Sequence, residues 1–239
     1  MFGRIRYYTL LPVYFIVLVA VLLTAITANR AYTTITEEAP IKYRMFVVID
    51  PGHGGIDGGA VSCNGYYESH INLEISMRLD DLMHLLGIQT VMTRKSDVSI
   101  HTTGESIAAK KVSDLKQRVK ITNSTPNALL ISIHQNYFSD SRYAGAQVFY
   151  AGTEGSAHLA NQLQESLKST LNPGSKRQAK KADGVYLLQN INCPAVLVEC
   201  GFLSNPEEEM KLRNDNYQKN ICCVIAANIS RYLNSSEVA

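Results

Sequence analysis

The sequence predicts an α/β domain built on a mostly parallel, twisted sheet flanked by helices. Short runs rich in Val, Ile and Leu are typical of buried strands. They alternate with longer segments in which apolar residues recur every three or four positions, as expected for helices. Strands that alternate with helices are typical of parallel sheets. One N-terminal transmembrane or signal helix is expected before this domain.

Length and composition restrict the classes of function. With 239 residues, the chain has room for one domain and an appendage. A formal net charge of +2 does not indicate a nucleic-acid-binding protein. Basic residues gather only at Lys176, Arg177, Lys180 and Lys181, interpreted as a solvated loop, with binding of an anionic polymer as the alternative. The five cysteines include no CxxC pair and do not indicate a disulfide framework or a cysteine metal site.

The N-terminal segment is apolar enough to be a membrane helix. No charged residue lies between Arg6 and Arg30, and about twenty apolar residues can span a bilayer. Arg4 and Arg6 precede the apolar residues, so the N-terminus is expected in the cytoplasm and the rest of the chain outside it. The alternative is a cleaved signal peptide. The match to an A-x-A cleavage site is poor, so an uncleaved anchor is favoured.

Three parts of the chain follow from this interpretation. Residues 1–29 are predicted to be the membrane anchor or signal segment, and residues 30–44 a polar linker. Residues 45–239 are predicted to be a catalytic domain outside the cytoplasm.

The first strand of the domain leads into a glycine-rich loop. Phe46 to Ile49 reads as a buried strand, and Asp50-Pro51-Gly52-His53-Gly54-Gly55 ends it abruptly. In open α/β sheets, ligands bind at the carboxyl ends of strands. The loop therefore presents His53 where a ligand site is expected.

The next elements are expected in chain order. A helix begins at Glu68 and ends at Gly87, and residues 88–93 form a second strand. Residues 98–111 are polar and without periodicity, which predicts a long loop. A helix is expected over residues 113–122. The remaining predictions are strands at 128–133, 146–150, 184–188 and 195–200, and helices at 156–171, 206–213 and 215–233.

Four polar residues stand where strands end or helices begin. His53 follows the first strand, Glu68 begins a helix, and His134 ends the strand at 128–133. Glu199 lies inside an apolar run, where an unpaired charge would be costly. A buried structural glutamate paired with an arginine is the alternative interpretation of Glu199.

Together these residues fit a zinc hydrolase. Two imidazoles and one carboxylate supply the three protein ligands of a catalytic zinc site. Zn²⁺ acidifies a bound water, and a second carboxylate must carry the proton to the leaving group. We therefore expect His53, Glu68 and His134 as metal ligands and Glu199 as the catalytic base.

Four blocks carry a resemblance to a known family. They are Asp50-Pro51-Gly52-His53-Gly54-Gly55, then Glu68 with Asn72-Leu73, then Ser132-Ile133-His134-Gln135-Asn136, then Glu199-Cys200-Gly201-Phe202-Leu203-Ser204-Asn205. In this order they resemble the zinc-dependent N-acetylmuramoyl-L-alanine amidases. The resemblance implies hydrolysis of the amide between N-acetylmuramic acid and L-alanine in peptidoglycan. It also implies the same three zinc ligands and the same catalytic glutamate.

Within this family, the chain is most similar to the membrane-anchored amidases of endospore-forming bacteria. The single hydrophobic segment and the blocks at residues 111–119 and 145–150 carry this similarity. It implies removal of stem peptides from spore cortex, the first step to the muramic-δ-lactam needed for germination. Two residues depart from the family pattern, Tyr137 after Asn136 and Cys200 after Glu199.

Other functions and roles stay open from the sequence. One alternative is a zinc peptidase that cuts within the stem peptide, and another is a catalytically idle wall-binding protein. Asp50, Asp57 and Asn136 are candidates to orient a ligand imidazole or to cap turns. The site is expected to be open to solvent, so control would come from expression timing, zinc affinity or an activating protein partner in the spore envelope.

Overall fold

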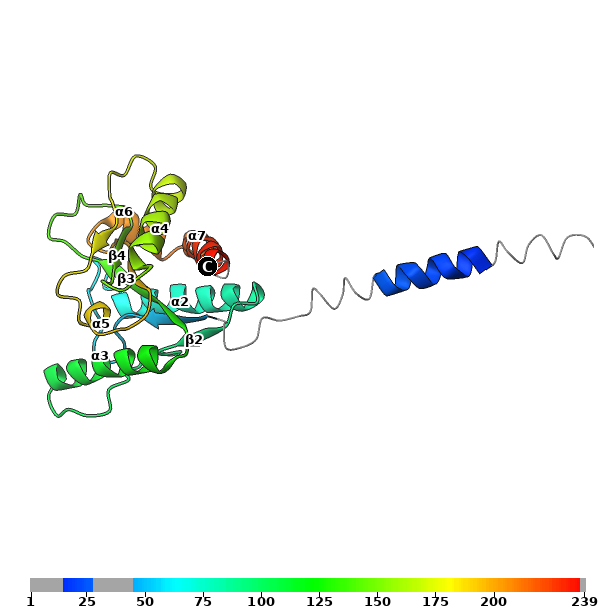
Figure 1. Cartoon of the computed structure of the whole chain (residues 1–239). Coiled ribbons are helices and arrows are strands. Elements are labelled where there is room, and N and C mark those ends of the chain that lie inside the picture. Colours follow the sequence, from blue (N-terminus) through cyan, green and yellow to red (C-terminus); the bar gives the residue numbers. More distant parts are fainter. Residues whose placement is uncertain (1–14, 28–44, 237–239) are drawn as a thin grey trace, which may run out of the picture. The chain divides into compact units, whose positions relative to one another are not determined.

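The computed structural model describes residues 15–27 and 45–236. The chain divides into two compact units, Met1–Arg44 and Met45–Ala239. In the first unit, residues 15–27 form a helix with exposed side chains (Figure 1). Within the described residues, no helix combines the length and apolar character needed to cross a bilayer. The rest of the predicted anchor and the whole predicted linker lie outside the described residues.

The second unit is built on one six-stranded sheet. Its strand order is β2-β1-β3-β6-β4-β5. All neighbouring pairs are parallel except β4 with β6, which confirms the prediction of a mostly parallel sheet. The strands are β1 (Phe46–Pro51), β2 (Thr90–Met92), β3 (Ala128–Asn136), β4 (Gln147–Tyr150), β5 (Lys180–Lys181) and β6 (Ala195–Phe202).

Helices cover both faces of this sheet. Helices α2, α4 and α7 pack together on one face, and α3 with the short α5 packs on the other (Figure 1). The helices are α2 (Glu68–Leu85), α3 (Ile107–Ser124), α4 (Ser156–Leu171), α5 (Tyr186–Gln189), α6 (Pro206–Leu212) and α7 (Asp215–Ser236).

The alternation of side chains along the central strands produces one core on each face. In β1, Val47 and Ile49 enter the larger core with α2, α4 and α7, whereas Val48 enters the smaller core with α5. Strands buried on both faces carry continuous apolar runs. This packing explains why β1, β3 and β6 each begin with four consecutive apolar residues.

The predicted loop over residues 98–111 was wrong at its end. Helix α3 begins at Ile107, where the Ser106 hydroxyl accepts a hydrogen bond from the backbone N–H of Ala109. The start of the helix was missed because residues 107–112 bury no side chain, so no apolar stripe marks the first turns, and the buried residues further along are polar. Those buried residues are Ser113, Asp114, Arg118 and Thr122.

The predicted strand over residues 184–188 was also wrong. Residues 186–189 form α5, and the edge strand β5 lies earlier, at Lys180–Lys181. Leu187 and Leu188 are adjacent and both buried in the smaller core. Two consecutive side chains buried in the same core fit a helical turn and not a strand, whose side chains alternate between faces.

Candidate metal centre and active site

The loop after β1 holds His53 in a conformation that few residues adopt. The φ angle of His53 is 61°, in the left-handed region, where a side chain other than glycine is uncommon and strained. Arg118 donates hydrogen bonds to the carbonyls of His53 and Pro51, at 2.6 and 2.8 Å. Arg94 donates to the carbonyls of Pro51 and Gly52, each at 2.9 Å. These bonds hold the loop in place.

Sequence reasoning missed the role of the two arginines. Both are buried, and both point at the loop carbonyls from other elements of the fold. Two signals could have found them. Arg118 lies four residues after Asp114 on one helix face, and Arg94 comes just after the carboxyl end of β2.

Gly52 allows the two imidazoles to come together. A Cβ atom at this position would lie 2.2 Å from Cε1 and from Nε2 of His134, closer than any side chain can approach. With glycine there, the ring centroids of His53 and His134 are 5.0 Å apart. His134 itself lies within β3, which continues to Asn136 beyond its predicted end at Ile133.

The carboxylate of Glu68 lies between the two imidazoles. Its Oε2 is 3.2 Å from Nε2 of His53, and its Oε1 is 3.0 Å from Nδ1 of His134. Backbone N–H groups of Ala60 and Gln135 also donate to this carboxylate. Burial disfavours its charge, but the hydrogen bonds and charges of His134 and His53 hold the pKa of Glu68 well below its ordinary value.

Asp57 orients the imidazole of His53. Its Oδ2 lies 2.9 Å from Nδ1 of His53, and its Oδ1 is 2.8 Å from Nζ of Lys111. Burial lowers the pKa of His53, but the hydrogen bonds to Asp57 and Glu68 outweigh it and raise the pKa to about 9. A carboxylate on one ring nitrogen leaves the other, Nε2, directed at Glu68. This is the usual arrangement behind a metal-binding histidine.

Asp50, another candidate for this role, has no hydrogen bond to either imidazole among the described residues. Its carboxylate accepts hydrogen bonds from Thr93 and Ser132, each at 2.7 Å, and from Arg118 at 2.6 Å. Asp50 therefore pairs with the arginine that holds the loop. The hypothesis that Asp50 orients an imidazole was wrong, and its effect on His53 is indirect.

The three residues expected as ligands fit a metal ion such as Zn²⁺. His53, Glu68 and His134 each offer one ligand atom, and these atoms lie within 4.8 Å of one another. Two ligands about 2.0–2.1 Å from a tetrahedral Zn²⁺ would lie roughly 3.3 Å apart. Each imidazole lies near that distance from one oxygen of the Glu68 carboxylate, at 3.2 Å from Oε2 for His53 and 3.0 Å from Oε1 for His134. Nitrogen and carboxylate donors also suit Zn²⁺ chemically.

Glu199 lies beside this cluster on the next strand. In the parallel pairing of β3 with β6, Glu199 is the register partner of His134. Its Oε2 is buried and has no hydrogen-bond partner within the described part of the chain. Burial raises the pKa of Glu199 to about 7, despite the opposing effect of the charge of His134. No arginine pairs with Glu199 among the described residues, so the structural alternative has no support there.

An unpartnered buried carboxyl with a pKa near neutrality has the properties of a general base. Buried polar atoms normally have a partner, so the free oxygen indicates a place for water or substrate. A carboxyl that titrates near neutrality can both accept and donate a proton during one reaction. The site can therefore hold a metal and transfer a proton next to it.

Comparisons with known proteins identify the family of this chain. A family model described as N-acetylmuramoyl-L-alanine amidase matches residues 47–231. The germination-specific N-acetylmuramoyl-L-alanine amidase of Bacillus subtilis is 38% identical over 188 residues, which are 78% of each chain. N-acetylmuramoyl-L-alanine amidase AmiA of Escherichia coli is 29% identical over 79% of this chain and 76% of its own length.

A solved structure agrees with the sequence comparisons. The CwlD amidase from Clostridioides difficile, in complex with the GerS lipoprotein, superimposes with a TM-score of 0.75 and 37% identity. The match covers 80% of this chain and 98% of that one. The matched residues run from β1 into α7. They include the glycine-rich loop, the three proposed ligands and Glu199. The chain therefore belongs to the N-acetylmuramoyl-L-alanine amidase family.

Proposed function

We propose that this protein is a Zn²⁺-dependent amidase that cleaves the bond between N-acetylmuramic acid and L-alanine in peptidoglycan. One observation carries the proposal. Two imidazoles and the Glu68 carboxylate converge, and the unpartnered Oε2 of Glu199 lies on the neighbouring strand. Metal ligands together with a free carboxyl are what metal-dependent amide hydrolysis requires of a protein.

The residues divide into two roles. His53, Glu68 and His134 hold the metal, and Asp57 keeps the His53 ring turned so that Nε2 faces inward. When bound, Zn²⁺ polarises the carbonyl under attack and acidifies the attacking water. Glu199 takes a proton from that water and passes it to the leaving nitrogen of the L-alanine.

Strain in the loop supports a positioning role for the arginines. Holding His53 at a φ of 61° costs of order 1–3 kcal/mol. Arg118 and Arg94 offset this through four hydrogen bonds to loop carbonyls. The fold itself therefore holds the loop in the conformation that directs His53 at the candidate centre.

The biological substrate we propose is spore cortex. The similarity to a protein named as a germination-specific amidase supports it. Removal of stem peptides would then be the first step to muramic-δ-lactam. The catalytic unit works outside the cytoplasm, and the apolar residues of the N-terminal segment attach it to the membrane as an uncleaved anchor.

A protein partner in the spore envelope is part of the same proposal. The similar CwlD amidase was solved in complex with a lipoprotein. The segment between Asn136 and Glu199 is occupied by β4, α4, β5 and α5, which belong to the sheet and its covering helices. This arrangement supports a candidate centre that is open to substrate and controlled by a partner protein.

The test separates the amidase from a stem peptidase and from an idle wall-binding protein. Purified cortex is digested with the wild type and with Glu199→Gln, and zinc content is measured in both proteins. An amidase releases stem peptides with free N-terminal L-alanine and leaves intact sugar chains. Fragments cut inside the stem would indicate a peptidase. No soluble product from zinc-loaded wild type would indicate a binding protein.

A further inference from the structure

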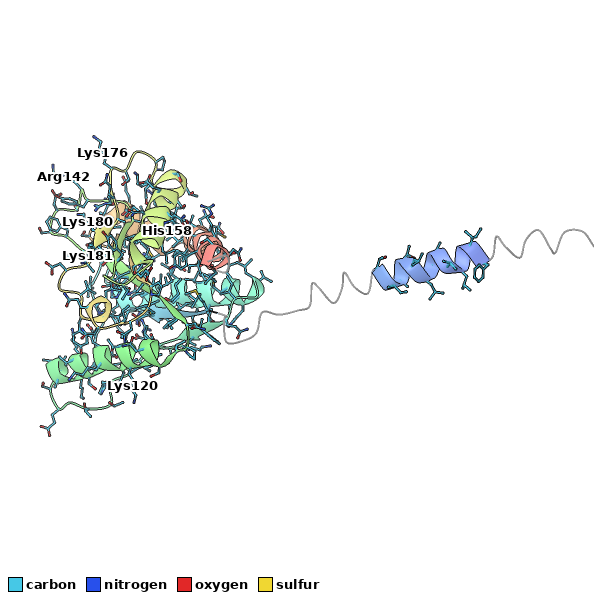
Figure 2. The ribbon with its side chains drawn as sticks, in the orientation of Figure 1. Lys120, Arg142, His158, Lys176, Lys180 and Lys181 are labelled. Atoms are coloured by element: carbon cyan, nitrogen blue, oxygen red, sulfur yellow. The ribbon has the colours of Figure 1, made fainter. Side chains whose placement is uncertain are left out.

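A basic cavity lies one strand away from Glu199. It has a volume of about 800 Å³ and is bordered by the loop before β4, the end of α4, the segment leading into β5, and α6. Figure 2 shows Arg142, Lys176 and Lys180 on the same side of the domain, away from Lys120 on α3. The basic side chains that line the cavity are Arg142, Lys176, Arg177, Lys180 and Lys211.

The positive charge of this cavity is largely uncompensated. Arg142 is paired with Asp140 at 2.7 Å. Within the described part of the chain, the other four basic residues have no carboxylate within ion-pair distance. The carboxylate in the lining, Glu208, is buried and accepts hydrogen bonds from the backbone N–H groups of Gly145 and Phe202, at 2.8 and 3.0 Å. An anion that enters the cavity therefore meets four cations that have no anionic partner among the described residues.

Arg177 is held in place by neutral partners. Its Nε donates to the carbonyl of Ala144 at 2.9 Å, and Nη1 lies 3.4 Å from the side-chain oxygen of Gln147. Its guanidinium carbon lies 4.7 Å from the centroid of the Phe202 ring. These partners are neutral, so they fix the direction of the guanidinium but leave its charge available to a ligand.

The cavity and the proposed metal ligands lie on opposite sides of Glu199. Gln147, which lines the cavity, is the register partner of Glu199 in the antiparallel pairing of β4 with β6. The proposed metal ligands lie on the other side of Glu199, toward β3 and β1. In the proposed function, on which this step rests, Glu199 gives its proton to the leaving nitrogen. The peptide half of the substrate then extends from Glu199 toward β4 and β5.

We propose that this cavity is a subsite that binds a carboxylate of the stem peptide. Neighbouring strands are about 4.8 Å apart, so β4 and β5 lie roughly 5 and 10 Å from β6. An extended peptide covers about 3.3–3.6 Å per residue. A carboxylate two to four residues beyond the scissile amide therefore reaches roughly 7–14 Å, the range in which Lys180 of β5 lies. The subsite favours stem peptides with free carboxylates over the same peptides with amidated ones.

The two adjacent lysines of β5 provide a matched pair of variants. Successive side chains of a strand point to opposite sides. Lys180 lines the basic cavity, whereas Lys181 lines a different one with Gly152 and Asp183. Both side chains are exposed. Lys180→Glu and Lys181→Glu thus make the same change of charge on the same strand, and differ in the cavity that receives it.

Equilibrium binding tests the subsite, and turnover tests the reaction separately. The ligands are a synthetic stem tetrapeptide with free carboxylates and the same peptide with every carboxylate amidated, added to the zinc-loaded full-length protein. We expect the wild type to prefer the free acid. Lys180→Glu should weaken binding of the acid roughly two- to fivefold, as expected for an exposed ion pair, and abolish the preference. Lys181→Glu should keep it.

Three outcomes would overturn the subsite. The wild type could bind the acid and the amide equally, or the two variants could behave alike. Alternatively, Lys180→Glu could weaken binding of a polyphosphate probe and leave peptide binding unchanged, which would make the cavity a site for an anionic polymer. Cleavage of the corresponding muramyl peptides is measured in parallel. Absence of cleavage would contradict the proposed amidase function, while the binding result would still decide the subsite.

Discussion

Replacing Asp57 by asparagine removes the negative charge that lies behind the imidazole of His53. The carboxylate of Asp57 is 2.9 Å from Nδ1 of His53 and is about one quarter exposed. Asparagine has nearly the same shape, and its amide oxygen can still accept the hydrogen bond. The substitution therefore changes the charge behind the proposed ligand and leaves the loop geometry intact.

The size of the effect follows from this contact. Loss of an outer partner of a metal-binding histidine typically lowers metal affinity or activity roughly 10- to 100-fold. Two features place Asp57→Asn near the lower end of that range. Lys111, 2.8 Å from Oδ1, already neutralises part of the charge, and the retained amide oxygen keeps the ring oriented. We expect a loss of zinc affinity of about tenfold, which is roughly 1.4 kcal/mol.

Competition with a chelator of known affinity measures this loss in the purified protein. Asp97→Asn is the matched control. Asp97 also accepts from the glycine-rich loop, at the N–H of Gly55, but it faces His70, which lies outside the candidate centre. We expect wild-type zinc affinity in the control. Equal zinc affinity in Asp57→Asn and the wild type would refute the orienting role, and an equal loss in both variants would assign the effect to the charge of the whole loop.

Three further predictions follow from the site. Glu199→Gln should retain zinc but turn over roughly 100- to 10,000-fold more slowly, because only proton transfer is removed. Steady-state kinetics and metal analysis test this, and high turnover or loss of zinc would contradict it. Gly52→Ala should abolish zinc binding, because its Cβ would meet the His134 ring at 2.2 Å. Gly152→Ala serves as its control in the same zinc titration, because a Cβ added at Gly152 would lie 3.5 Å from its nearest neighbouring atom, which is ordinary contact. Arg118→Met should lower the free energy of unfolding by about 3–5 kcal/mol, because it leaves the buried carboxylates of Asp50 and Asp114 without their cation. A denaturant midpoint at the wild-type value would contradict this.

The central part of the fold could be predicted from local sequence patterns. Continuous apolar runs identify β1, β3 and β6 because both faces of these strands are covered by helices. Helices α2 and α4 were predicted at their observed starts, Glu68 and Ser156, because an apolar periodicity begins there. Where polar groups form the inner face, as in α3, the same reasoning placed the start six residues too late.

The members of the candidate site could be identified for a related reason. A charged residue in an apolar run, such as Glu199, contradicts the pattern around it, and a histidine after a strand lies where α/β sheets bind ligands. Residue type and position along the chain therefore single out His53, Glu68, His134 and Glu199 as candidates.

Only the tertiary structure decided how these residues meet and what supports them. Glu68 and His134 are 66 positions apart, and the pairing of β1 with β3 and the start of α2 bring them within 3.0 Å. The choice between Asp50 and Asp57 depends on which way each carboxylate points. That direction is set by the left-handed turn at His53 and by buried Arg118, contributed by a helix 65 residues further along the chain. Such contacts depend on the packing of distant segments, for which no local pattern exists.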